Sequence, residues 1–248
     1  MKKVTRDWVQ NNYNGEQSFS IPDGMTTIEK EAFYECERLE SITFPTTMTK
    51  IGDSAFRGCT NLTSITIPDG VKMIRPFAFC CCESLETVII PNSVTDIGES
   101  AFSGCKSLTS IDLPDGLTLI KKAVFKCCHS LASVTLPDSI TEIGDFAFAE
   151  CAILKSITIP DAVTKIGENA FALSGLESII IPNSLIQIRL YAFSCCKKLT
   201  SITLFDNVTR FGHAVFYNCE NLTVYCNPGS AAEKYAKDND IATAPINR

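Results

Sequence analysis

The sequence is poor in the residue types on which catalysis, nucleic-acid binding and membrane insertion depend. It has 2 histidines and 1 tryptophan in 248 residues, and 22 basic against 28 acidic side chains leave a net charge of −6. Without clustered Lys and Arg there is no expected surface for phosphate groups, so nucleic acid is not an expected partner. The apolar runs, such as residues 178–182, are far shorter than the roughly 18 residues that cross a bilayer. We therefore expect no membrane span.

Cysteine and phenylalanine are abundant, with 13 and 15 residues, and an internal repeat accounts for most of them. Prolines recur every 23 residues from Pro22 to Pro160, then after 22 residues at Pro182, and Phe205 takes the next equivalent place. These residues begin nine repeats, and each of them is position zero of its repeat. The eleventh position is always phenylalanine: Phe33, Phe56, Phe79, Phe102, Phe125, Phe148, Phe171, Phe193 and Phe216.

Identical apolar residues at a fixed period predict a solenoid, because stacked coils align each column into a continuous buried ladder. Before each proline, a Leu-x-x-Ile-x-Ile pattern such as Leu62, Ile65 and Ile67 alternates at period two and is rich in β-branched residues. It predicts one short strand per repeat in a parallel sheet. The segment that leads to the phenylalanine is too short for more than a single helical or 3₁₀ turn.

The repeat unit Leu-x-x-Ile-x-Ile-Pro-x-x-Val-x-x-Ile-Gly-x-x-Ala-Phe-x-x-Cys, seen in residues 62–82 and 85–105, resembles the BspA-like leucine-rich repeat, also called the Treponema pallidum type. The similarity extends from Pro22 to about Pro228. It implies a right-handed leucine-rich-repeat solenoid of the α/β type, with the strands on the concave face and short helical or 3₁₀ turns and loops on the convex face. It also implies surface adhesion and protein binding, without fixed catalytic residues.

The ends of such an array need covers, because an open sheet edge recruits other chains. We expect residues 1–21 to form an N-terminal cap with the first strand, residues 22–228 the nine repeats, and residues 229–248 a C-terminal cap helix and tail. Ser230 is predicted to be the N-cap of that helix. Trp8 and Tyr235 are interpreted as anchors of the two caps.

Eight cysteines share the fourteenth position of the repeat. A buried free thiol behaves as a small hydrophobe, and the parallel side chains of adjacent coils would strain a disulfide, so we expect reduced structural thiols. The column is expected to be interrupted in the repeat that starts at Pro160, which is one residue short. Its members are Cys36, Cys59, Cys82, Cys105, Cys128, Cys151, Cys196 and Cys219.

The other cysteines and the histidines form no recognisable reactive pattern. Zinc sites commonly use paired C-x-x-C spacings, and none is present. His129 and His213 lie four coils apart, and Cys128 is next to His129 in sequence, so the two side chains should point to different sides of the coil. We expect no catalytic residue, no metal site and no cofactor. The five remaining cysteines are Cys80, Cys81, Cys127, Cys195 and Cys226.

Candidate partner-binding residues interrupt two surface columns. The outward positions of the predicted strands are mostly Ser and Thr, and they are broken by Ile89, Asp112 and Ile180. These residues either suit a strand or mark a binding hot spot. The ninth position is usually polar but also holds Phe77, Phe146 and Tyr191, which either anchor a partner or fold under the next turn.

Two functions remain open. The first is a non-enzymatic protein-binding or adhesion module, a monomer whose curved surface engages a protein or another macromolecule. The second is a structural or self-assembling scaffold; an enzyme is the third and least supported alternative. Localisation also stays open. Polar residues between Thr5 and Asn12 replace the apolar segment of a signal peptide, which favours the cytoplasm, whereas the family resemblance implies the cell surface.

Overall fold

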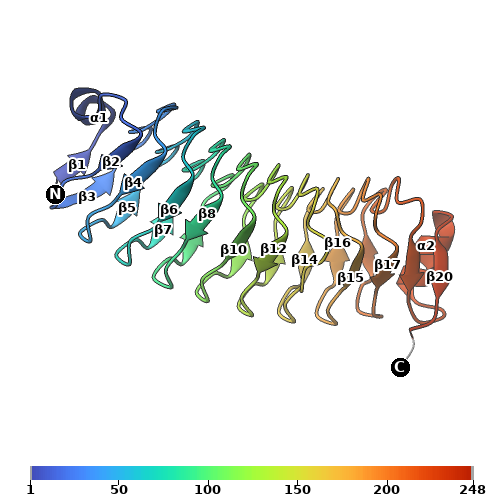
Figure 1. Cartoon of the computed structure of the whole chain (residues 1–248). Helices are drawn as coiled ribbons and strands as arrows, with labels where there is room; N and C mark the ends of the chain where they lie inside the picture. The colour runs from blue at the N-terminus through green and yellow to red at the C-terminus, as the bar shows by residue number, and fades with distance from the viewer. Residues whose placement is uncertain (1, 247–248) are drawn as a thin grey trace.

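The computed structural model describes residues 2–246. They form one row of stacked coils, with helix α1 (Arg6–Asn12) at one end and helix α2 (Ala231–Asp238) at the other (Figure 1). Each repeat contributes one coil to the row. The expected leucine-rich-repeat solenoid, with a short parallel strand in the repeat and little helix, is confirmed.

A three-residue strand precedes the proline in most repeats. Its central residue is buried, or half-buried at Phe19 and Val134, and its outer two residues face solvent, as in Ser64–Thr66. Neighbouring strands pair in parallel, with Ile65 opposite Val88. Residues 156–158 occupy the same place without forming a strand, although Ile157 stays buried. These pre-proline strands are β2 (Ser18–Ser20), β4 (Ser41–Thr43), β6 (Ser64–Thr66), β8 (Thr87–Ile89), β10 (Ser110–Asp112), β12 (Ser133–Thr135), β15 (Ser178–Ile180), β17 (Ser201–Thr203) and β19 (Thr223–Tyr225).

A second strand follows position zero of every repeat, two residues long except for the four-residue β3, and the sequence pattern does not predict it. It ends at the sixth position, where Ile51 pairs with Ile74, and this position is buried in every repeat but the last, in which Phe211 is half-buried. Two residues are too few to show a period of their own, so only the stacking reveals them. These strands are β3 (Met25–Ile28), β5 (Lys50–Ile51), β7 (Met73–Ile74), β9 (Asp96–Ile97), β11 (Leu119–Ile120), β13 (Glu142–Ile143), β14 (Lys165–Ile166), β16 (Gln187–Ile188) and β18 (Arg210–Phe211).

The third side of each coil consists of turns. The Ala32 N–H donates to Glu29 O, so the expected helical turns occur as isolated three-residue turns. They do not extend into a helix because the ninth and thirteenth positions have left-handed backbone, as at Glu31 (φ 58) and Glu35 (φ 55). The Glu31 N–H donates instead to Asp53 O of the next coil at 2.9 Å. The turns therefore add a third backbone ladder between coils.

The phenylalanine column forms the centre of the core. Its nine rings stack along the row with neighbouring centroids 5.0 to 5.9 Å apart. Aromatic residues of the caps close both ends edge-on, Tyr13 against Phe33 at 6.3 Å and Tyr235 against Phe216 at 6.1 Å. Trp8 reaches the same cluster through an edge contact with Phe19.

The caps also cover strand edges. At the N-terminus, β1 (Lys2–Val4) pairs in parallel with β3, and at the C-terminus β20 (Ala242–Ala244) pairs in parallel with β19. Helix α2 follows Ser230, whose side chain accepts the Glu233 N–H as an N-cap. The Tyr235 hydroxyl accepts the Val215 N–H at 2.8 Å, so the cap helix is tied to the last coil by a hydrogen bond as well as by packing.

The cysteine column has a hydrogen-bonding role that the sequence did not reveal. Seven of its thiols donate to the phenylalanine carbonyl of the preceding coil, with S···O distances of 3.0 to 3.3 Å. The expected interruption is only partly correct. Ser174 fills the fourteenth position, is buried, and lies 3.3 Å from the Cys196 Sγ through its Oγ. The missing residue comes after it, so a hydroxyl replaces the thiol without opening a gap.

Candidate partner-binding surface

The outward residues of the pre-proline strands form a strand face that is dominated by hydroxyl groups. Ile180 and Ile89 interrupt it with 67% and 56% of their surface exposed. Ile89 and Asp112 lie on adjacent coils, whereas Ile180 lies four coils beyond Ile89, about 19 Å away at ~4.8 Å per coil. Asp112 accepts a hydrogen bond from the Thr135 hydroxyl at 2.9 Å. The structure therefore brings two of these three candidates together and separates the third.

Ile180 stands between two shallow depressions. One, of about 400 Å³, is lined by Ser156, Thr158 and Pro182 among others, and the second, of about 360 Å³, by Thr203 and Tyr225. Ile180 contributes to both. An exposed apolar side chain is thus flanked on each side by hollows with hydroxyl groups in their walls.

The depressions follow irregularities in the stacking. The 400 Å³ hollow contains residues 156–158, which form no strand, and it adjoins the repeat that is one residue short. A further hollow of about 470 Å³ includes Thr43 and Thr66 of β4 and β6, which are not paired with each other. The short repeat is visible in the sequence, and its 22-residue spacing is the signal that could have pointed to the strand face around Ile180.

The aromatic candidates lie on the turn side of the coil. Phe77 is 36% exposed, and Phe146 and Tyr191 are half-buried. The Arg57 guanidinium lies 5.8 Å from the Phe77 ring centroid, and the Lys126 ammonium lies 5.5 Å from that of Phe146. The rings therefore already have cationic neighbours from the coil before them.

The backbone of these aromatic residues carries no functional signal. Phe77, Phe146 and Tyr191 have φ values of 57, 58 and 55, but Ser54 and Ser100 at the same position have 53 and 55. The left-handed conformation is a property of the ninth position, whatever residue occupies it. The six candidates thus divide between two sides of the coil and do not form a single site.

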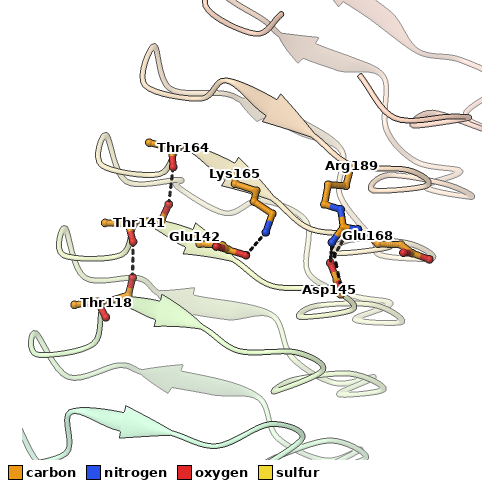
Figure 2. Close-up of polar contacts among 8 residues, drawn as sticks. All are labelled: Thr118, Thr141, Glu142, Asp145, Thr164, Lys165, Glu168 and Arg189. Atoms are coloured by element: carbon orange, nitrogen blue, oxygen red, sulfur yellow. Dashed lines mark hydrogen bonds and ion pairs between the residues drawn. The ribbon is translucent and has the colours of Figure 1, made fainter. Parts of the chain in front are cut away.

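The post-proline strands form a third, charged face whose side chains satisfy one another (Figure 2). Lys165 Nζ lies 2.6 Å from Glu142 Oε1, and the Thr141 hydroxyl donates to Thr118 O at 3.0 Å. Several of its acidic and basic groups form ion pairs between coils, such as Lys121 with Asp96 and Arg189 with Asp145. This face has the features of a solvated surface, and its exposed apolar side chains, Leu119 at 39% and Ile186 at 46%, are less exposed than Ile180.

One cluster of reactive side chains was not anticipated. The ligand atoms of Cys127, His129 and Glu150 all lie within 4.8 Å of one another. Burial and the neighbouring Glu150 carboxylate raise the pKa of the Cys127 thiol, which is the opposite of what a nucleophilic cysteine needs. Glu150 is not among the residues that the sequence pattern singles out. The missed signal is its spacing of 23 residues from Cys127.

Within residues 2–246, neither helix has the length and apolar character needed to span a bilayer. The stacked coils, the phenylalanine column and the hydroxyl-rich strand face define a leucine-rich-repeat solenoid, a class of generally non-enzymatic binding modules. The family model of the BspA type leucine-rich repeat region, in six copies, matches residues 11–132 and 95–223. The chain belongs to this family.

Solved structures of leucine-rich repeat proteins share the fold. A leucine-rich repeat protein from Bacteroides ovatus is 31% identical with a TM-score of 0.66; the match covers 84% of this chain and 65% of that one. The leucine-rich repeat protein of T. pallidum is 26% identical with a TM-score of 0.54, and the match covers 93% of this chain and 86% of that one. This chain therefore spans slightly less than two thirds of the Bacteroides protein. No curated protein is significantly similar to it.

Proposed function

We propose that this chain is a non-enzymatic protein-binding module whose partner contacts the strand face around Ile180. The observation that carries the proposal is the 67% exposure of Ile180 between two depressions on a face otherwise rich in hydroxyl groups. Fully burying such a side chain contributes about 1.5–3 kcal/mol. A partner that covered Ile180 would therefore gain affinity from one residue.

The surroundings of Ile180 suit a protein partner. Binding hot spots are apolar anchors that are surrounded by weaker contacts which exclude water. Pro182 and Tyr225 supply further apolar surface beside Ile180, and Ser156 and Thr203 supply hydrogen-bonding groups. The strand face has few charges to desolvate, so burying it is less costly than burying the paired charges of the post-proline face.

Ile89 extends this surface. It lies about 19 Å from Ile180 along the same column, at ~4.8 Å per coil. Only a ligand of macromolecular size reaches both residues. The extended array therefore supports a protein partner over a small molecule.

Retention of a partner protein by the immobilised chain tests the proposal. A double variant, Ile89→Ser with Ile180→Ser, removes both apolar side chains from the strand face. The matched control is Ile153→Ser with Ile186→Ser, since these residues are 45% and 46% exposed and lie outside the pre-proline strands. We expect a protein that is retained by the wild type and the control and lost from the double variant. Equal retention by all three would contradict the proposal.

The scaffold alternative gives a different result. If the retained protein is a second copy of this chain, and light scattering shows a mass that rises with concentration, the array assembles with itself. A monomer at all concentrations that still retains a foreign protein supports the binding module.

A further inference from the structure

We propose that Cys127, His129 and Glu150 form a binding site for a thiophilic divalent cation of the zinc class. The thiol, imidazole and carboxylate ligand atoms all lie within 4.8 Å of one another. These are the three side-chain types that bind Zn²⁺ in proteins, and three protein ligands with water in the fourth place make an open site. Cys127 and Glu150 are half-buried and His129 is exposed, so an ion can enter from solvent.

The backbone holds two of the ligands in place. Cys127 and Glu150 occupy the thirteenth position of successive coils, where both have left-handed backbone with φ of 59 and 64. The Cys127 N–H donates to Ala149 O at 2.9 Å, directly before Glu150. Each ligand therefore starts from a fixed main chain in the turn ladder, and only side-chain rotation is needed to adjust the site.

The grouping is not a consequence of the repeat. The equivalent three positions one repeat pair earlier are Cys81, Glu83 and Gly104, and near the C-terminus they are Cys195, Lys197 and Asn218. Glycine has no ligand atom, and lysine places a positive charge where His129 stands. Among the repeats, this coil and its successor combine a thiol, an imidazole and a carboxylate at these positions.

The geometry needs a small contraction. At zinc–ligand distances of about 2.0–2.3 Å, the ligand atoms of a tetrahedral site lie about 3.5 Å apart. Because the three atoms lie within 4.8 Å of one another, they must close by at most about 1.3 Å to reach this spacing. Binding converts the Cys127 thiol to a thiolate and releases its proton to solvent. The cation then offsets the repulsion between that thiolate and the Glu150 carboxylate.

The positive charge of the Lys126 ammonium weakens cation binding at this site. Its Nζ lies 3.9 Å from Glu150 Oε1 and 5.5 Å from the Phe146 ring centroid. A bound cation would compete with it for the Glu150 carboxylate. Removing this ammonium should therefore tighten binding without touching a ligand.

Titration of the reduced full chain with Co²⁺ tests the site, because a thiolate bound to Co²⁺ gives a charge-transfer absorption in the near ultraviolet. We expect this band to saturate at one equivalent, to be displaced by Zn²⁺ and to be absent in Cys127→Ser. His129→Ala and Glu150→Gln should weaken binding at least about tenfold, since even outer-shell changes cost that much in metal sites. Cys195→Ser is the matched control and should bind as the wild type does.

Other outcomes overturn the proposal. A band that persists in Cys127→Ser, or that is lost in Cys195→Ser, places the metal elsewhere. So does a band lost only when Cys80 and Cys81, whose sulfurs lie 3.6 Å apart, are both changed to serine. Circular dichroism confirms that each variant is folded. If Cys127→Ser is not, Lys126→Ala provides the test, and binding no tighter than in the wild type would contradict the site.

Discussion

The Arg189 Nη1 lies 3.1 Å from Asp145 Oδ1, although the two residues are 44 positions apart and a whole coil runs between them (Figure 2). The coil between them has Gly167 at the seventh position, the position that Arg189 occupies in its own coil. A Cβ at Gly167 would lie 2.5 Å from the Asp145 N and 2.7 Å from its Oδ1. The ion pair therefore depends on the absence of a side chain in the intervening repeat.

Gly167→Ala is expected to destabilise the protein by about 1–3 kcal/mol, the usual cost of forcing atoms into a packed region. The matched control is Gly116→Ala, because the nearest atom to its Cβ would be the side-chain methyl of Thr95 at 3.1 Å, which can move. Urea denaturation measures both. Equal losses of unfolding free energy would show that the contact with Asp145 is unimportant.

The buried thiols make the folded state less stable at alkaline pH. Burial raises the pKa of Cys82, Cys105 and Cys128 well above the ordinary thiol value of 9.0. In the unfolded chain these thiols lose their protons near pH 9, whereas the folded chain retains them. Stability is therefore full below that pH and falls above it, by about 1.4 kcal/mol per thiol and pH unit.

Urea midpoints at about pH 8 and about pH 10 check this slope. Cys105→Ala should reduce the loss between the two conditions, because one buried thiol is removed. Ile153→Ser should leave it unchanged, since it removes an exposed isoleucine and no thiol. A loss that is the same in all three proteins would assign the alkaline sensitivity to other groups.

The thiol column should tolerate a hydroxyl better than a methyl group. Cys105 Sγ donates to Phe79 O at 3.3 Å, and Ser174 shows that a hydroxyl fits this position. We expect Cys105→Ala to cost about 1–2 kcal/mol through the lost hydrogen bond and the small cavity, and Cys105→Ser to cost less. Thermal unfolding of the two variants measures these losses of stability. A larger loss for Cys105→Ser than for Cys105→Ala would contradict the hydrogen-bonding role of the thiol.

The sequence predicts the solenoid because its columns are regular. The buried phenylalanines and Ile51 or Ile74 at the sixth position recur at one spacing, and stacking is the only arrangement that buries them all. The features that the sequence does not predict depend on contacts between coils. The two-residue strands have no period, and the Cys127 and Glu150 pair becomes visible only when residues 23 positions apart are placed side by side. The hollow beside Ile180 likewise includes the segment 156–158, which forms no strand although it has an ordinary repeat sequence.

The C-terminal cap should respond in two stages to changes at Tyr235. Tyr235→Phe removes only the hydrogen bond from the Val215 N–H and should cost about 1 kcal/mol. Tyr235→Ala also removes the ring that stacks on Phe211 at 4.6 Å and should cost about 3–5 kcal/mol. Hydrogen exchange in residues 211–217 measures the local effect. Equal protection in the wild type and Tyr235→Ala would show that the ring does not hold the cap.

The affinity of the captured partner for Ile180→Ser tests the central claim most directly. Calorimetry should give a Kd at least about 30-fold above that of the wild type, corresponding to the loss of about 2 kcal/mol at a hot spot. Ile153→Ser, which removes an isoleucine that is 45% exposed and lies outside the pre-proline strands, should leave the Kd unchanged. A wild-type Kd for Ile180→Ser, or an equal loss for Ile153→Ser, would contradict the assignment of the strand face as the binding surface.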